Sequence, residues 1–216
     1  LIETFAKQNN CLLELKTKTV NIESLLHLDH NEKTVFAWSL NTPAVISSEE
    51  KGTASLKARF EAARRVESEG YKLAFHFDPI VIYPGCEVQY KKVVKQIFKY
   101  VHPESIVWIS IGTFRFMPKL KQIIEKRFKH STIPYGEFIL GLDNKMRYFK
   151  PLRINIYKEI ISCIREYAPD LMVYFCMEDQ EVWEKCIGFF PEKEGELGHL
   201  LDKSAVTHCS LNSNLL

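Results

Sequence analysis

Short β-rich runs alternate with helical patterns over most of this chain, and this alternation limits the fold more than any other feature. The runs that we predict as strands are Leu12–Leu15, Thr34–Leu40, Lys72–Ile82, Ser105–Ile111 and Leu171–Phe175. The helical patterns between them are Ser55–Glu69, Glu87–Tyr100, Met117–Phe128 and Ile154–Tyr167. Strands joined through helices favour right-handed crossovers between parallel neighbours. The sequence therefore predicts an α/β protein whose parallel sheet is apolar on both faces.

Five strand–helix units leave two architectures open. An open doubly wound sheet can consist of five units, whereas a partial barrel needs about six, so one unit would lie outside this sequence. Residues Leu1–Asn10 resemble the end of a helix with no cap before it, and the chain starts at Leu1 rather than Met. We therefore expect a further segment to precede this sequence.

Composition excludes several classes of protein. The 216 residues are 46% hydrophobic and 26% charged, and 29 Lys and Arg against 27 Asp and Glu give a net charge of +2. These fractions are typical of a globular protein and exclude a polybasic nucleic-acid binder, although a local basic face is compatible with them. No apolar run approaches the length of a membrane helix and no secretion leader is present, so we expect a cytoplasmic protein without membrane contact.

The cysteines do not form a motif. The closest pair along the chain, Cys176 and Cys186, is ten residues apart, which excludes CxxC and compact metal-ligand spacing. Six cysteines would also allow disulfides, but a chain of this length without a leader favours free thiols in structural positions. We therefore assign no metal ligand in this chain.

Polar residues follow every predicted strand. In a parallel α/β sheet, ligands bind at the C-terminal ends of the strands, so these residues converge on one edge. Lys18, Ser39 and Asn41 would together suit a carboxylate, although each also fits a solvated or capping role. Asp78 precedes a proline and fits a turn, and His76 between two phenylalanines is more typical of a core histidine. Nucleophile-elbow, HExxH, P-loop and GxGxxG motifs are absent, so no catalytic residue is assigned.

A basic and aromatic segment occupies Tyr135–Arg153. Asp143-Asn144 predicts a turn, and the flanking aromatic residues suit a hairpin. Basic side chains bind phosphates and aromatic rings stack on bases, so the segment predicts either a nucleic-acid contact or a solvated excursion. The residues that we predict to contact nucleic acid, here and after the fourth strand, are Arg115, Lys145, Arg147, Tyr148 and Arg153.

An ordered set of short motifs covers most of positions 12 to 150. They are Lys16-Thr17-Lys18, Ser39-Leu40-Asn41, Gly52-Thr53, Arg59-Phe60-Glu61-Ala62-Ala63, Gly70-Tyr71, Asp78-Pro79-Ile80, Tyr83-Pro84-Gly85, Phe114-Arg115-Phe116, Ile124-Glu125-Lys126 and Lys145-Met146-Arg147-Tyr148. In this order they resemble the spore photoproduct lyase family and the wider DNA-repair-lyase-like radical S-adenosylmethionine proteins. The resemblance implies a partial (β/α)6 TIM-like barrel, truncated here at the N-terminus.

The resemblance also implies an activity. Members of the family bind S-adenosylmethionine and a 4Fe-4S cluster, generate a 5'-deoxyadenosyl radical and revert a thymine dimer in DNA. Lys18 and Ser39 match the family's S-adenosylmethionine contacts, and Asn41 and Asp78 belong to the same wall. The CxxxCxxC cluster motif has no match in this chain, so the cluster ligands would lie outside it. Where the family's hairpin has an Arg-Tyr pair followed by Gly, this chain has Lys150-Pro151-Leu152-Arg153.

Three functional hypotheses follow. The first is the C-terminal part of a spore photoproduct lyase-type radical enzyme, with positions 1–190 as barrel, a hairpin inserted around 131–153, and 191–216 as an extension or tail. The second is a cluster-free relative that binds nucleic acid without lyase activity. The third is an unrelated α/β-barrel enzyme that acts on a small molecule.

Overall fold

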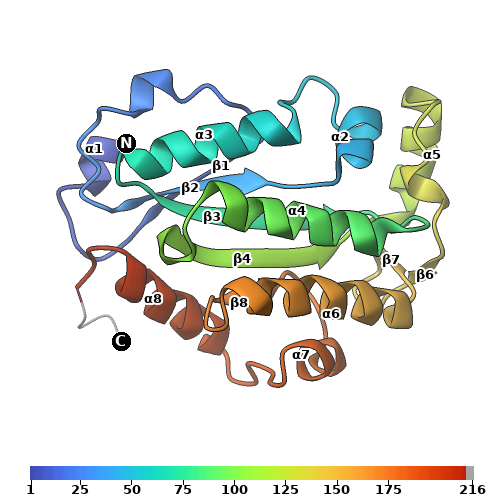
Figure 1. Cartoon of the computed structure of the whole chain (residues 1–216). Helices are drawn as coiled ribbons and strands as arrows, with labels where there is room; N and C mark the ends of the chain where they lie inside the picture. The colour runs from blue at the N-terminus through green and yellow to red at the C-terminus, as the bar shows by residue number, and fades with distance from the viewer. Residues whose placement is uncertain (213–216) are drawn as a thin grey trace.

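The computed structural model describes residues 1–212 and shows a parallel sheet of five strands in the order β1-β2-β3-β4-β8. The strands are β1 (Leu13–Thr17), β2 (Thr34–Ser39), β3 (Lys72–Ile80), β4 (Ile106–Thr113) and β8 (Val173–Phe175). Every neighbouring pair is parallel, so all C-terminal ends meet at one edge, on the right of Figure 1. The predicted fold class, a partial TIM-like barrel built on a parallel sheet, is confirmed.

Helices cover one face of this sheet. The α-helices are α1 (Ile2–Phe5), α2 (Pro43–Glu49), α3 (Leu56–Ser68), α4 (Cys86–Tyr100), α5 (Pro118–Arg127), α6 (Lys150–Tyr167), α7 (Gln180–Cys186) and α8 (Glu196–His208). Single 3-10 turns occur at η1 (Glu23–Leu25), η2 (Pro103–Ser105) and η3 (Ile133–Tyr135). The apolar residues that recur at helical spacing in α3 and α4 pack on alternate residues of the strands, as with Phe60 on Phe75, whose ring centroids are 6.5 Å apart. This packing forms the main hydrophobic core.

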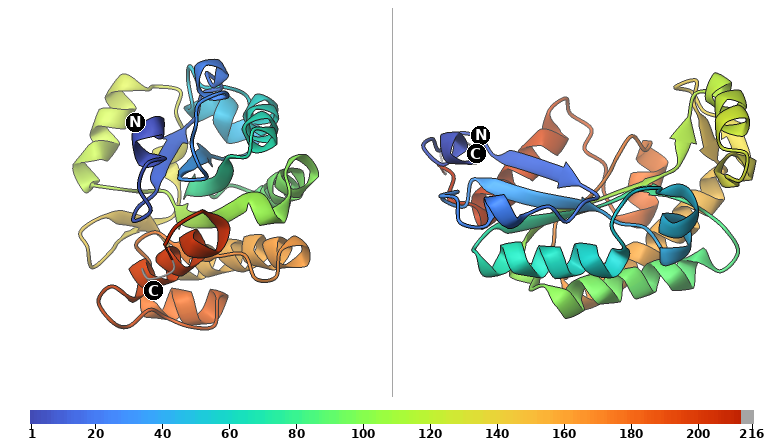
Figure 2. Two further views of the ribbon diagram at one scale, coloured as in Figure 1. Left: turned by 90° about the vertical axis from the view of Figure 1, so that its left-hand side faces the viewer. Right: turned by 90° about the horizontal axis from the view of Figure 1, so that it is seen from above.

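The opposite face, which we call the inner face, is covered in part by α8 (Figure 2). The inner face carries small side chains toward the strand N-termini, among them Val35, Ala37 and Ala74, and these let the helix approach closely. The Ser204 hydroxyl of α8 donates a hydrogen bond to the Val107 carbonyl of β4. Much of the region that we expected to be an extension or tail is therefore a packed helix, while residues 213–216 lie outside the described part.

A three-stranded antiparallel sheet stands beyond the C-terminal edge of the main sheet. It contains β5 (Arg115–Phe116), β6 (Phe138–Leu140) and β7 (Met146–Tyr148), in the order β5-β7-β6. The hairpin between β6 and β7 turns at Asp143 and Asn144, as predicted, and Asn144 adopts a positive φ of 59°. Phe138 packs between Phe116 and Tyr148, which ties the hairpin to β5.

Several element boundaries differ from the predictions by one to four residues, and two of these differences affect the predicted site residues. The hairpin ends before Phe149, because α6 begins at Lys150 with Pro151 in its first turn, where its missing N–H costs no hydrogen bond. The basic residues of 150–153 are therefore helical rather than part of the hairpin. The first strand continues to Thr17, two residues beyond the predicted end. None of the helices in the described residues is long and apolar enough to cross a membrane.

Candidate functional site

Polar side chains form a row across the inner face near the C-terminal edge. The strand register pairs Ser39 with His76, His76 with Ser110, and Ser110 with Tyr174. Lys18 directly follows the register pair of Thr17 and Trp38, so it lies at the end of the same row. Four strands and the loop after β1 therefore place these groups together.

A buried ion-pair network fixes the first part of this row. Lys18 Nζ lies 2.7 Å from Glu50 Oε1, and Arg59 Nη2 lies 2.7 Å from Glu50 Oε2. Arg59 is fully buried and donates from Nη1 to the Ser39 carbonyl at 2.7 Å. Burial alone raises the pKa of Glu50, but the hydrogen bonds from Lys18 and Arg59 outweigh it and lower that pKa. The network ties the end of β1 to the end of β2.

The Ser39 hydroxyl has no hydrogen-bond partner among residues 1–212, although the residue is only 6% exposed. Lys18 is one-third exposed and keeps N–H groups that Glu50 does not occupy. A ligand carboxylate placed here would accept hydrogen bonds from both groups.

Asn41 lies in the same wall but is committed to the fold. Its Nδ2 donates to the Pro79 carbonyl at 2.9 Å, and its Oδ1 accepts from the Tyr90 hydroxyl at 2.5 Å. The residue is 2% exposed. Its side chain therefore connects the end of β3, which contains the cis peptide bond between Asp78 and Pro79, to α4.

Asp78 lies at the next strand end, in a cluster with Arg115 and Cys176. Arg115 Nη1 is 3.4 Å from Asp78 Oδ1, and Arg115 Nη2 is 3.0 Å from Cys176 Sγ. A Cβ at Gly112 would lie 3.0 Å from Asp78 Oδ1 and 3.1 Å from Arg115 Nη1, so the cluster closes over a residue without a side chain. Burial, followed by the Asp78 charge, raises the pKa of Cys176, which keeps it a thiol at neutral pH.

His76 faces Glu14 in the middle of the row. His76 is 5% exposed, and its Nε2 lies 2.9 Å from Glu14 Oε1 at an angle outside hydrogen-bond geometry. Burial raises the pKa of Glu14, yet the neighbouring His76 and the positive charge of Lys16 lower it overall. We expected His76 to be a core residue and made no prediction for Glu14. The charged residues Glu14, Lys16 and Lys18 alternate along the chain, which was the signal, because alternate residues of a strand share a face.

The five residues predicted to contact nucleic acid are held by internal contacts. Arg147 pairs with Asp143 and donates to the Met177 carbonyl at 2.9 Å. Arg153 is 4% exposed and pairs with Glu178, and Lys145 lies 3.9 Å from Asp143. The hydrogen bond from Arg147 lowers the pKa of Asp143 to about 2. Tyr148 is buried and its hydroxyl accepts from the Ile82 amide at 3.2 Å, while Arg115 belongs to the Asp78 cluster.

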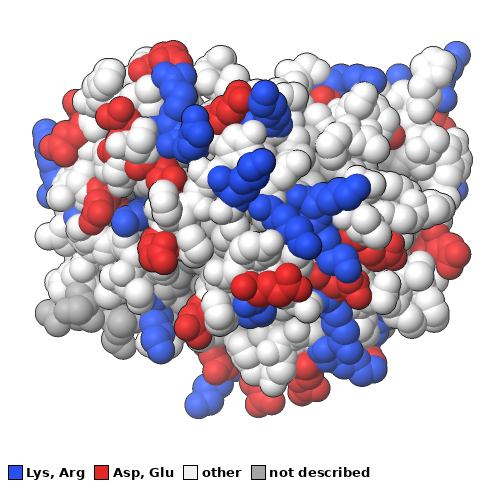
Figure 3. All heavy atoms as spheres, in the orientation of Figure 1, with Lys and Arg blue, Asp and Glu red and all other residues white. Residues whose placement is uncertain are grey.

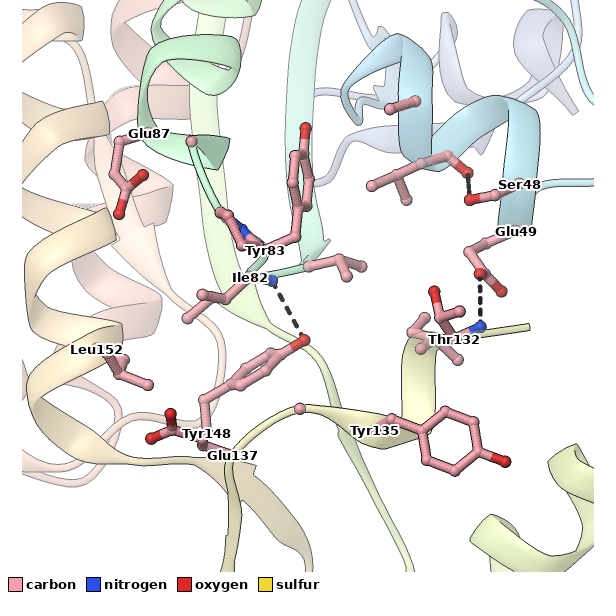
Figure 4. A pocket seen from close by; sticks show the side chains of 17 residues that line it. Ser48, Glu49, Ile82, Tyr83, Glu87, Thr132, Tyr135, Glu137, Tyr148 and Leu152 are labelled. Atoms are coloured by element: carbon pink, nitrogen blue, oxygen red, sulfur yellow. Dashed lines mark hydrogen bonds between the residues drawn. The ribbon is translucent and has the colours of Figure 1, made fainter. Parts of the chain in front are cut away.

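Three hollows lie beside the hairpin, and the smallest, of 340 Å³, is lined by Asp78, Arg115 and Lys145. The other two are larger. One, of 510 Å³, is enclosed by the β6–β7 turn and the loop after β8, and it contains Leu140, Leu142 and Met177. The other, of 750 Å³, lies between α2, the loop after β3 and η3 (Figure 4). Its charged lining residues are Glu49, Glu87 and Glu137, which makes it unsuitable for an anion, and it does not include the row of strand-end residues.

The described residues suit the two expected cofactors unequally. Among them, no three His, Cys, Asp or Glu residues converge to hold a metal ion, and all six cysteines are free thiols. An iron–sulfur cluster therefore has no ligand set in residues 1–212. For S-adenosylmethionine, Lys18 and the unpaired Ser39 hydroxyl suit the carboxylate, and Asp78 suits an ammonium or ribose hydroxyl. This fit rests on the chemistry of the three side chains at the strand ends.

A parallel α/β partial barrel with polar groups at its strand ends defines a class of ligand-binding barrels. Residues 1–162 match the family model described as spore photoproduct lyase. The chain belongs to the spore photoproduct lyase family.

Known relatives agree with this assignment. A spore photoproduct lyase of Bacillus subtilis is 32% identical over 170 residues, covering 77% of this chain and 47% of the relative. One of a Geobacillus species is 33% identical over 150 residues, covering 68% and 42%. A solved mutant of spore photoproduct lyase with bound AdoMet and dinucleoside spore photoproduct has a TM-score of 0.74 and 27% identity, covering 81% of this chain and 54% of that one. The chain spans about half the length of the curated relatives it matches.

Proposed function

We propose that this chain provides the S-adenosylmethionine-binding wall of a spore photoproduct lyase-type radical enzyme that reverts a thymine dimer in DNA. Family membership supports the reaction class, and a related structure holds both AdoMet and a dinucleoside spore photoproduct. The observation that carries the proposal is the unpaired Ser39 hydroxyl beside Lys18, both fixed by Glu50 and Arg59 at the strand-end edge.

The chain's own residues have separate tasks in this proposal. Lys18 and Ser39 bind the cofactor carboxylate, and Asp78 accepts a hydrogen bond from its ammonium or ribose. When bound, and with one electron from a donor outside the described residues, S-adenosylmethionine would supply the radical that abstracts hydrogen from the substrate. Arg115 holds Asp78 in place, and Cys176 remains a protonated thiol next to it. Because residues 1–212 hold no ligand set for a cluster, we derive no step through one.

Cofactor binding by this chain is a direct test. A ligand present at about 100 times its Kd stabilises the folded state by about 2.7 kcal/mol, so S-adenosylmethionine should raise the melting temperature of the 216-residue protein by about 5–10 °C. Lys18→Ala should raise the Kd about 10-fold to 100-fold, since it removes a charged hydrogen bond.

Lys99→Ala is the matched control, because Lys99 is exposed on α4, which packs on the other face of the sheet, and the charge change is identical. Its Kd should stay within about twofold of the unmodified value. The proposal fails if S-adenosylmethionine leaves the melting temperature unchanged, or if both variants weaken binding equally.

The second candidate is a cluster-free relative that binds nucleic acid without lyase activity. The absence of a converging cysteine set within residues 1–212 fits this candidate, and it also fits the first one, whose cluster ligands would lie outside this chain. Anaerobic treatment with iron and sulfide should therefore yield no stoichiometric cluster in this chain under either candidate, as measured by iron analysis and visible absorbance. The melting experiment separates them, because a relative without lyase activity should bind thymine-rich DNA while S-adenosylmethionine leaves its melting temperature unchanged.

A further inference from the structure

Helix α5 projects from the molecule beyond the C-terminal edge of the main sheet, beside the three-stranded sheet (Figures 1 and 2). None of its ten residues is buried, and the segment 126–130 that ends and follows it is exposed throughout. A helix that buries no residue is not explained by packing, because helices in proteins are stabilised mostly through a buried face. Another role for this arm is therefore needed.

The arm, which we define as residues 118–130, has a larger net positive charge than the whole chain. The arm contains five Lys and Arg against one Glu, a net charge of +4. The whole chain carries +2, so all other residues together carry −2. Figure 3 shows blue side-chain atoms at the upper right corner, where α5 lies in Figure 1.

The cations of the arm differ from those of the hairpin because they have no acidic partners. Within the described part of the chain, no side-chain ion pair or hydrogen bond is formed by Lys119, Lys126, Arg127 or Lys129. The Lys121 ammonium contacts only the ring of Tyr135, at 5.4 Å from its centroid. By contrast, the hairpin cations Lys145 and Arg147 are paired with Asp143, and Arg153 at the start of α6 is paired with Glu178. Five neighbouring cations without counter-ions repel one another, so this arrangement is stabilised when an external polyanion binds.

The outward face of α5 has a spacing that suits a nucleic-acid strand. Lys119, Ile123 and Lys126 follow one another at i, i+4 and i+7, which places them on one face, and Arg127 lies beside them. Lys119 and Lys126 are about 10 Å apart along the helix axis. Phosphates of one DNA strand recur about every 3.4 Å along the duplex axis, so this face spans about three of them.

We propose that the arm 118–130 docks on the sugar–phosphate backbone of DNA, with Lys119, Lys126 and Arg127 as the phosphate-binding residues. The proposal rests on the proposed function for its choice of polyanion. An anionic membrane is the other surface that a basic helix can bind. Leu120, Ile123 and Phe128 are exposed along one side of the arm, as a membrane-binding helix would also require. The choice of DNA over a lipid surface therefore follows from the proposed function, and the vesicle experiment below distinguishes the two.

The test compares two triple variants of the full chain. Lys119→Ala, Lys126→Ala and Arg127→Ala together neutralise the arm. The matched control combines Lys92→Ala, Lys95→Ala and Lys99→Ala, which removes the same charge from exposed positions on α4. Binding to a short thymine-rich duplex is measured by fluorescence anisotropy between about 50 and 200 mM salt. Thermal melts check that both variants remain folded.

The arm variant should raise the Kd about 10-fold to 100-fold and reduce the slope of log K against log salt by about 3, since each phosphate contact contributes about 0.9. The α4 variant should leave the slope unchanged. Equal effects of the two variants would overturn the proposal, because they would reflect net charge alone. It is also overturned if neither variant changes the slope or if the unmodified chain does not bind the duplex.

A membrane role has a distinct signature. The chain is cosedimented with vesicles of equal parts phosphatidylcholine and phosphatidylserine. If the unmodified chain binds these vesicles, and the arm variant loses vesicle binding but keeps its DNA binding, the proposal is overturned in favour of a lipid surface. The rise in melting temperature that S-adenosylmethionine should cause does not depend on the arm. If that rise is observed but the arm variant binds DNA as tightly as the unmodified chain, only the proposal for the arm is refuted.

Discussion

Arg59 is the residue on which the geometry of the proposed cofactor wall depends most. Its guanidinium is fully buried and contacts the Ser39 carbonyl, the Ala54 carbonyl, Thr53 and Glu50. Arginine suits this position because its planar fork donates several hydrogen bonds in fixed directions. The motif Arg59-Phe60-Glu61-Ala62-Ala63 supported the family resemblance, but the sequence alone did not reveal what Arg59 holds in place.

Removing the charge of Glu50 tests this network. Glu50→Gln leaves the buried Arg59 without its carboxylate, and breaking such a pair costs about 3–5 kcal/mol. We expect the urea-unfolding free energy to fall by about 3 kcal/mol and S-adenosylmethionine affinity to fall with it. Glu61→Gln is the control, because Glu61 pairs with Lys57 at exposed positions, where an ion pair contributes less than about 1 kcal/mol. Equal losses in the two variants would show that the network has no special role.

At the scale of elements, α8 shows how a helix completes the inner face. Its buried side is formed by Ser204 and Ala205, whose small size lets it lie close to β4. Periodicity did not distinguish this segment, because its apolar stripe is weak and the small residues that decide the packing do not stand out in a hydrophobic pattern. Their partners, among them Ala37 and Ala74, come from distant strands.

Aspartate substitutions on the buried and on the exposed side of α8 test whether this helix packs against the sheet. Ala205→Asp should destabilise the protein by at least about 3 kcal/mol, since it buries an unpaired carboxylate. Lys203→Asp, on the exposed side of the same helix, should change stability by less than about 0.5 kcal/mol. Urea unfolding measures both. Two silent substitutions would mean that α8 is not packed against the sheet.

For the molecule as a whole, ionisation limits the pH range of stability on both sides. The pKa values of Asp143 and Glu181 are lowered to about 2 by their basic partners, from ordinary values of 3.8 and 4.5. Their stabilisation is therefore present above about pH 4.5 and lost as the pH falls toward 2. Burial raises the pKa of Tyr148 and Tyr157 from 10.0 to about 12, so their contribution is present below pH 10 and lost between 10 and 12.

We therefore expect a stability plateau between about pH 5 and 9, with a decline on each side. Urea-unfolding free energies measured in steps from pH 2.5 to pH 11 would show it. The acid decline should shrink in the Asp143→Asn variant, because that residue can no longer bind a proton. A profile that stays flat from pH 5 to 2.5 would contradict the assignment of these ion pairs.

The sequence by itself determined the class of fold and the family, and it predicted the edge of the sheet at which a ligand would bind. Alternating strand and helix patterns are local properties of the chain, and five parallel strands leave only one edge at which Lys18, Ser39 and Asp78 meet. The tertiary structure alone decided which polar groups remain available. Arg147 and Arg153 look like ligand-binding cations in the sequence, yet folding gives them acidic partners, while Lys119, Lys126 and Arg127 are left without any. Pairing of this kind depends on residues brought together from distant parts of the chain, which no local pattern records.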